Sequence, residues 1–273
     1  MPFRKIVLAI SCVVWSCAFA GCGINIFPVS KDVELGKQVD KEIRGNAKQY
    51  PIMKGHDDVR QYVRTVANTV LQSSEVKYRG TFPYTVDIIQ DDKTVNAFCT
   101  PGGYIYVYTG LLKYIDNEAT LAGVLAHEIA HAERRHATQH MTNALGMQEL
   151  VNVALGNSPS QVAKIGANLF SGLALLQHTR SEEAEADEYS FKYLKSTATY
   201  YPGGIKYFFE KILRTNKGGG AVDNTLNRFL SDHPLSEDRL NAIETLLKDN
   251  KIGPPSEQTL RMAAFKSMQG KLP

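Results

Sequence analysis

TLAGVLAHEIAHAERRHATQH, residues 120–140, has the apolar spacing of a buried helix, yet it carries four histidines and two glutamates. Imidazoles and carboxylates on a buried helix face destabilise a protein unless something binds them. A helix is therefore predicted from about Asn117 past all four histidines, with a bound metal ion as the reason for its polar side chains.

Two of these histidines have the spacing of metal ligands. His127 and His131 are four residues apart, so a helix projects both imidazoles from one face, a single turn apart. Glu128 is offset by about 100° from His127, which suits a general base beside a metal better than a ligand. The pattern predicts one zinc ion per chain, with Glu128 activating water. The alternative is a pair of surface histidines, which the apolar neighbours disfavour.

A hydrolytic zinc ion keeps three protein ligands, so a third must come from elsewhere. The three-histidine zinc motif requires Gly three and His six residues after the second ligand, where this chain has Arg134 and Ala137. His136 and His140 are therefore expected to support the site from outside or to lie on the surface.

TRSEEAEADEY, residues 179–189, contains the best third ligand. Among its glutamates only Glu183 is followed four residues later by an aspartate, Asp187, which a helix places on the same face. An aspartate there can orient a ligand imidazole. We predict that His127, His131 and Glu183 bind the zinc ion. The alternative is a solvated acidic helix start, which the helix dipole makes common.

The flanking sequence predicts an α+β fold that is mainly helical. A small sheet with an antiparallel hairpin at about 94–110 should pack on the active-site helix, because β-branched and aromatic runs flank the turn TPGG. The predicted helices span about 29–50, 56–73, 179–196, the region 200–213 and 236–250, and the predicted strands span 82–90, 94–99 and 104–110. Residues 144–177 are apolar but broken, residues 216–224 form a loop, and the tail from 253 has one weak helix.

The first 22 residues have the pattern of an export signal, with Arg4 and Lys5 before an apolar run. The ending Ala20-Gly21-Cys22 resembles a bacterial lipobox, which implies cleavage before Cys22 and acylation of that cysteine. The expected organisation is a signal peptide over 1–21, a metallopeptidase domain over 22–250 and a tail over 251–273. A plain secreted product or an uncleaved anchor remains the alternative.

Composition excludes other classes. Lys plus Arg outnumber Asp plus Glu by 31 to 28, without long runs of one sign, so no nucleic-acid partner is expected. Cys99 is the only cysteine beyond the signal and the lipobox, so disulfides cannot stabilise the domain. It is expected to be a small buried side chain.

Five segments together resemble family forty-eight of the zinc metallopeptidases, over roughly residues 30–250: NAF (96–98), PGGYIYVYTGLL (101–112), LAHEIAHAERRH (125–136), TRSEEAEAD (179–187) and HPLSEDR (233–239). The family pattern S-R-x-x-E-x-x-A-D again selects Glu183, with Thr179 in place of Ser. The resemblance implies a gluzincin-type fold and metalloendopeptidase activity on polypeptides. It favours the compact periplasmic lipoprotein branch, held to the outer membrane by its lipid anchor.

The resemblance also implies roles for further residues. His233 is expected beside the metal, either as a donor to the oxyanion or as a fourth ligand that closes the site, and Arg239 is expected to hold the acidic groups nearby. As in other zinc peptidases, an extended substrate would pair with a strand edge, here at Asn96, Ala97 and Phe98.

Two other classes compete with an envelope peptidase. A periplasmic chaperone or assembly factor with a latent zinc site would leave Glu128 without an evident purpose. A carboxylate-bridged di-metal protein would need more Glu and His at i, i+3 spacing, which the sequence lacks.

Overall fold

The structure is a computed structural model that describes residues 25–145, 177–217 and 224–273. The predicted export signal with Cys22 and most of the apolar segment 144–177 lie outside this part of the chain. The helices are α2 (Val29–Gly45), α3 (Asp57–Leu71), α4 (Thr109–Tyr114), α5 (Glu118–Arg134), α6 (His136–Ala144), α9 (Arg180–Thr197), α10 (Gly204–Lys217), α11 (Asn227–Asp232), α12 (Glu237–Asp249), α13 (Glu257–Leu260) and α14 (Met262–Gln269), and the 3₁₀ turn η2 covers Asn224–Leu226. No helix among the described residues is long and apolar enough to cross a membrane.

The three strands are β1 (Thr85–Ile89), β2 (Ala97–Thr100) and β3 (Tyr104–Tyr108), in the order β1-β3-β2. β2 and β3 form the predicted antiparallel hairpin, and the tight turn is possible because Gly102 and Gly103 have φ angles of 75° and 84°. β1 adds to β3 in parallel, which the sequence did not predict. The mainly helical α+β fold is confirmed, with β2 at one edge of the sheet.

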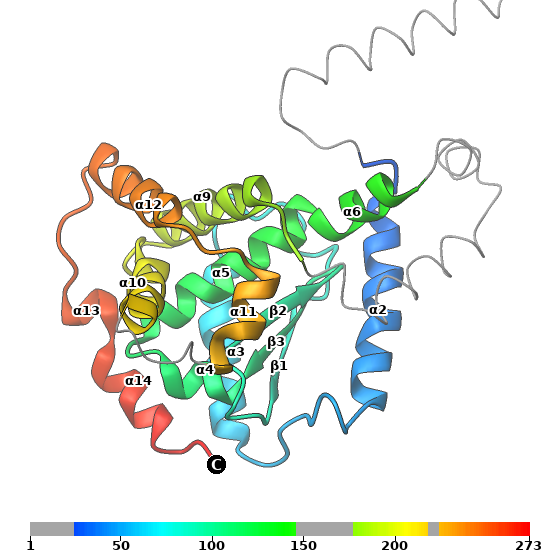
Figure 1. Ribbon diagram of the computed structural model, residues 1–273, viewed down its shortest axis with the longest axis horizontal. Coiled ribbons are helices and arrows are strands. Elements are labelled where there is room, and N and C mark those ends of the chain that lie inside the picture. Colours follow the sequence, from blue (N-terminus) through cyan, green and yellow to red (C-terminus); the bar gives the residue numbers. More distant parts are fainter. Residues whose placement is uncertain (1–24, 146–176, 218–223) are drawn as a thin grey trace, which may run out of the picture.

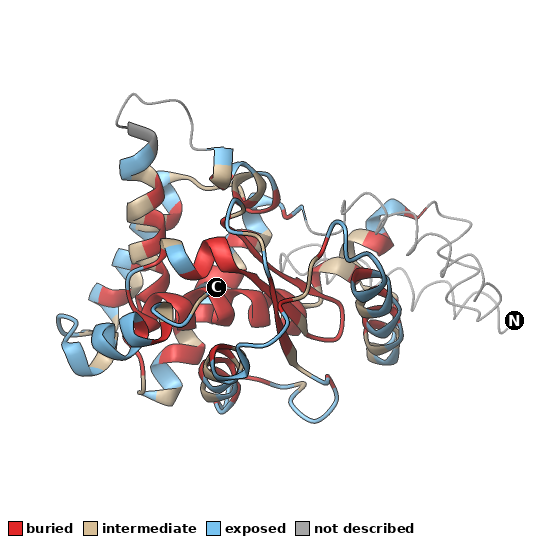
Figure 2. Ribbon diagram, turned by 90° about the horizontal axis from the view of Figure 1, so that it is seen from below, coloured by how far each residue is buried: buried red, intermediate tan, exposed pale blue. Residues whose placement is uncertain are grey.

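Helix α5 is the centre of the core. All its residues from Glu118 to Glu133 are buried, and its first turn is capped by Asn117, whose side chain accepts a hydrogen bond from the Thr120 amide. The sheet and α3 pack on one side of α5, and α9 and α10 pack on the other (Figure 1). Buried residues fill this middle layer, whereas the outer helices expose their far faces (Figure 2). The zinc motif therefore lies on the most enclosed helix described.

The prediction of one helix past all four histidines is wrong. α5 ends at Arg134, and Arg135 adopts a left-handed φ of 59° before α6 begins. That conformation costs about 1–2 kcal/mol for a residue other than glycine. The Arg135 guanidinium offsets this cost by donating to the Asp32 carboxylate at 2.7 Å and to the Phe27 carbonyl at 2.6 Å. Contacts from the distant N-terminal segment thus break the helix at Arg135, although the helical sequence pattern continues past this residue.

The C-terminal tail packs on the core instead of extending from it. It contains two short helices, α13 and α14, rather than the single one expected. Phe265 is fully buried, and Arg261 lies 2.9 Å from the buried carboxylate of Glu118 at the start of α5. α10 continues to Lys217, into the predicted loop, and residues 218–223 lie outside the described chain.

Candidate metal centre

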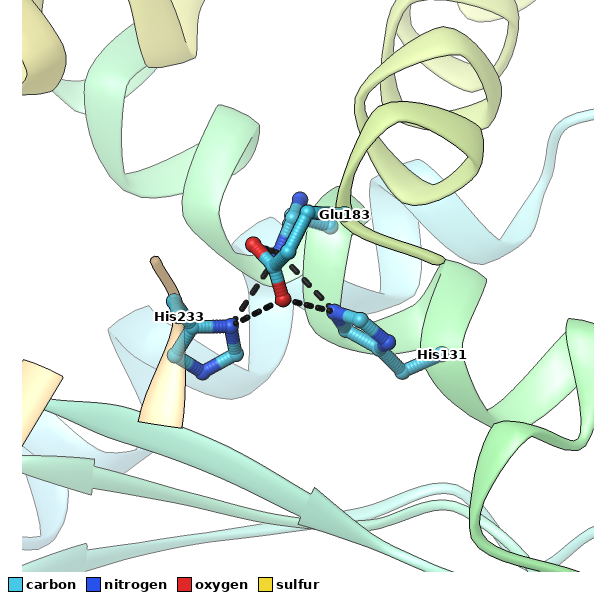
Figure 3. A group of neighbouring side chains, drawn as sticks. His131, Glu183 and His233 are labelled. Carbon is cyan, nitrogen blue, oxygen red and sulfur yellow. Dashed lines mark hydrogen bonds and ion pairs between the residues drawn. The ribbon is translucent and has the colours of Figure 1, made fainter. Parts of the chain in front are cut away.

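Four ligand-type side chains meet at one point between α5, α9 and the end of α11. Figure 3 shows His131, Glu183 and His233 pointing toward one another from these three elements. Nε2 of His127 lies 2.9 Å from Nε2 of His131. Oε1 of Glu183 lies 3.4 Å from Nε2 of His131 and 3.0 Å from Nδ1 of His233. All four side chains are buried.

Local helix signals place these residues. α9 starts with a capping box, in which the Thr179 side chain and Glu182 each satisfy the other's backbone amide, so Glu183 falls in the first turn. His233 is held at the end of α11, where its amide donates to the Phe229 carbonyl at 2.7 Å and its ring stacks on the Phe229 ring. The site thus joins three segments that are far apart in the sequence.

The donor set fits zinc. Each of His127, His131, Glu183 and His233 offers one ligand atom, and these atoms all lie within 4.8 Å of one another. Imidazole nitrogens with one carboxylate oxygen are the usual zinc ligands, and such a set in a buried place would otherwise be poorly satisfied. A fourth ligand from His233 would fill the position that a hydrolytic zinc site usually leaves open.

Charged groups behind the ligands hold them in position. Oδ1 of Asp187 lies 2.9 Å from Nδ1 of His127, on the side of the ring opposite the other ligands. The guanidinium of Arg239 lies 2.7 Å from Asp187 and 2.5 Å from Glu183, and all three residues are buried. A carboxylate behind a ligand imidazole fixes its tautomer and orientation. The structure thus places Asp187 behind the ring of His127, one turn along α9 from Glu183.

The pKa values of the ligands shift in different directions. Burial alone would lower the pKa of His127, but Glu183 and Asp187 outweigh it and raise the pKa to about 9. Burial, reinforced by the charge of His127, lowers the pKa of His131 well below its usual value. Two imidazoles whose ligand nitrogens lie so close cannot both be protonated, so one stays neutral and free to coordinate a cation.

Glu128 lies beside this group without joining it. Its carboxylate is buried, and Oε1 has no hydrogen-bond partner among the described residues; Nε2 of His233 lies 3.6 Å from it. Burial raises the pKa of Glu128, against the opposing charges of His233 and His127. An unpartnered oxygen on a buried carboxylate is rare in folded proteins and is suited to accepting a proton from a bound water molecule.

Two further histidines surround the ligands. Nδ1 of His136 lies 2.7 Å from Nδ1 of His131, and its Nε2 lies 2.9 Å from Glu185. The sequence assigned His136 only an outer or surface position. His178 was missed altogether, although it directly precedes Thr179 and the acidic motif; its ring stacks on His131 with centroids 3.6 Å apart.

The proposed substrate segment is buried and lies at the edge of the sheet. The Asn96 carbonyl accepts from the Tyr108 amide, and the antiparallel alternation then turns the backbone groups of Ala97 and Cys99 away from β3. The side chains of Ala97 and Phe98 are buried, and the Asn96 side chain donates to Asp232 at 3.0 Å. Only backbone groups of this segment are therefore suited to pairing with a peptide. The Cys99 thiol is buried and its pKa is raised by burial.

Comparisons with known proteins agree with this site. Residues 57–247 match Peptidase family M48. The chain is 28% identical over 222 residues to the beta-barrel assembly-enhancing protease of Escherichia coli strain K12, covering 78% of this chain and 43% of that protein. It is 33% identical over 161 residues to the mitochondrial metalloendopeptidase OMA1 of Schizosaccharomyces pombe, covering 59% and 46%. It is 33% identical over 165 residues to the metalloprotease LoiP of Escherichia coli strain K12, covering 59% and 62%.

The chain spans less than two thirds of the length of each of these relatives. One of these relatives is named as a metalloendopeptidase, the enzyme class that the motifs predict, and the other two are named as proteases. The matched range covers more than half of the sequence and includes all four ligand-type residues and Glu128. The predicted family is therefore confirmed: the chain belongs to peptidase family M48.

Proposed function

We propose that the chain is a zinc-dependent endopeptidase of the bacterial cell envelope. The observation that carries the proposal is the geometry around Glu128. A buried carboxylate, one oxygen of which has no partner in the described part of the chain, lies next to a group of imidazole and carboxylate ligand atoms that all lie within 4.8 Å of one another. A purely structural metal site would not need this extra buried carboxylate.

His127, His131 and Glu183 would hold the zinc ion. Bound zinc supplies Lewis-acid polarisation of a carbonyl group and makes a water molecule more acidic. Glu128 takes up the proton of the attacking water and passes it to the leaving amine, as general base and then general acid. His233, once turned from the ligand group, can donate a hydrogen bond to the carbonyl oxygen as negative charge develops on it. Asp187 keeps the ring of His127 in place throughout.

The proposed substrates are exported envelope proteins that are unfolded or misassembled. An extended peptide can pair with the outer edge of β2 through backbone hydrogen bonds, which recognise few side chains. The name of the Escherichia coli relative, a beta-barrel assembly-enhancing protease, fits this class of substrate. A lipidated Cys22 would hold the enzyme at the outer membrane on its periplasmic side.

The test compares wild type with Glu128→Gln on unfolded casein. Both proteins are expected to hold one zinc ion per chain after dialysis, because Glu128 is not a ligand. Cleavage by the variant should fall by about 10²–10⁴-fold, the usual contribution of a general base. Lys113→Gln, at an exposed ion pair, serves as the control and should match wild type. Equal cleavage by Glu128→Gln and wild type would refute the proposal.

A latent zinc site in a chaperone or assembly factor is the second candidate, favoured by one observation. Nδ1 of His233 lies 3.0 Å from Glu183 and 3.4 Å from His127, within the ligand group itself. If this histidine closes the site, His233→Ala should cleave casein faster than wild type. The chaperone would be favoured by a different result: wild type and His233→Ala, both loaded with zinc, fail to cleave casein but prevent the aggregation of unfolded protein.

A further inference from the structure

We propose that the chain has a second metal site, formed by His140, His178 and Glu182, that binds a zinc-like transition-metal ion independently of the catalytic centre. Each residue offers one ligand atom, and the three atoms lie within 4.8 Å of one another. Two imidazoles with one carboxylate form a donor set that zinc, copper and nickel bind. None of the three belongs to the ligands assigned above to the catalytic ion.

The three ligands come from separate elements. His140 is on α6, Glu182 is in the first turn of α9, and His178 lies in the segment that precedes α9. Nε2 of His140 lies 2.7 Å from Oε2 of Glu182. A bound ion would therefore link α6 to the start of α9, and the link should stabilise the folded chain.

The pair of His140 and Glu182 would not by itself indicate a site. Oε2 of Glu182 already accepts from the amide and the hydroxyl of Thr179 in the capping box, so the helix start alone accounts for the position of this carboxylate. His178 is the observation that requires another explanation.

His178 is a buried histidine with one ring nitrogen that lacks a hydrogen-bond partner among the described residues. It is 9% exposed, and its Nδ1 has no hydrogen-bond partner in the described chain. Its backbone amide donates to the Asp232 carbonyl at 3.1 Å, and its ring stacks on His131. The residue is thus held in place while a ring nitrogen remains unsatisfied. A buried nitrogen in this state destabilises the fold unless a ligand satisfies it.

An ion can reach this place from solvent. His140 and Glu182 line a cavity of about 570 Å³ between α6 and α9, together with Thr179, Ser181 and Glu185 among other residues. The side chains of His140 and Glu182 keep 17% and 12% of their surface exposed toward it. Two of the three proposed ligands thus border the cavity, which supplies the entry path that a metal site requires.

A neighbouring group does not compete with this assignment. His131, His136 and His178 also lie close enough to share an ion. However, Nδ1 of His131 is already hydrogen-bonded to Nδ1 of His136, and Nε2 of His131 faces the catalytic ligands. His178 is therefore assigned to the group that contains His140 on α6 and Glu182 on α9.

The test is a zinc titration of the full chain, dialysed until one equivalent remains, with a competing zinc-binding dye. Wild type should bind a second equivalent, more weakly than the first. His178→Phe keeps the aromatic stack on His131 but removes both nitrogens, and His140→Gln removes another ligand. Each variant should weaken the second binding step by at least about 10–100-fold, the range known for partners that only support a metal ligand. His56→Gln, at an exposed histidine outside both groups, should match wild type.

Two readouts separate this site from the catalytic one. Cobalt in place of zinc should give two absorbance steps in wild type and one in His178→Phe. The second zinc equivalent should raise the melting temperature of wild type and of His56→Gln but not that of His178→Phe. Saturation of wild type at one equivalent would overturn the proposal. So would a second zinc-binding step that is equally strong in His178→Phe, His140→Gln and His56→Gln. Glu183→Ala should lose the first zinc equivalent and keep the second. This result would support the second site even if the chain proved inactive on peptides.

Discussion

The Nδ1 atoms of His131 and His136 lie 2.7 Å apart, and the far nitrogen of His136 lies 2.9 Å from Glu185. The carboxylate thus holds His136, and His136 holds His131, so that Nε2 of His131 faces His127. Both histidines are buried, which removes water as an alternative partner. These contacts support His131 in the same way that Asp187 supports His127.

His136→Phe should therefore weaken zinc binding at the catalytic centre. The ring volume is retained but the bond to His131 is lost, and support of this kind contributes about 10–100-fold to metal affinity. Competition with a zinc chelator measures the change. Glu185→Gln, which keeps an acceptor for His136, should lose less. Unchanged zinc affinity in His136→Phe would mean that packing alone orients His131.

The four-residue spacings that led to the predicted ligands depend on local periodicity, which the sequence shows directly. A spacing of four on a helix is enough to bring His127 beside His131, and to bring Glu183 above Asp187. The contact between His136 and His131 cannot be predicted from helical spacing. On a straight helix, a residue five positions after His131 is turned about 140° away from it. The break at Arg135 reorients His136, and that break depends on Asp32, a contact over 103 residues.

His178 and the strand order escaped prediction for the same reason. A lone histidine before a helix cap has no periodic partner, and its neighbours on α5 and α6 are known only after folding. Likewise, the turn TPGG indicates that β2 and β3 pair, but nothing in the sequence near β1 indicates that it joins β3 in parallel. Hydrophobic patterns define elements, whereas long-range contacts define how they meet.

Arg239→Met should strongly destabilise the zinc-free protein. The guanidinium lies between the buried carboxylates of Asp187 and Glu183. Removal of one partner leaves buried charge uncompensated, which typically costs about 3–5 kcal/mol. Urea unfolding after zinc removal measures the loss. Lys113→Met, at an exposed pair with Asp92, is the control, with an expected effect of at most about 1 kcal/mol. Similar midpoints for both variants would contradict the role of Arg239.

Phe265→Ala should show that the tail is part of the folded core. Phe265 is fully buried on α14, and removal of such a ring typically costs about 3–5 kcal/mol. Met262→Ala lies on the same helix, with Met262 45% exposed, and should change the free energy of unfolding by less than about 1 kcal/mol. Equal stability of the two variants in urea would show that residues 251–273 pack only loosely on α5.

Peptide cleavage should be lost on the acid side at a higher pH than an ordinary carboxyl group would give. As the proposed general base, Glu128 would act in its ionised form, and burial raises its pKa above the reference value of 4.5. Activity is therefore complete above the raised pKa and falls as the pH drops through it. The measurement is kcat/KM against pH with zinc content determined at each point, because protonation of His127 and His131 would also release the ion. A plateau that extends down to pH 4.5 at full zinc occupancy would show that Glu128 is not the proton acceptor.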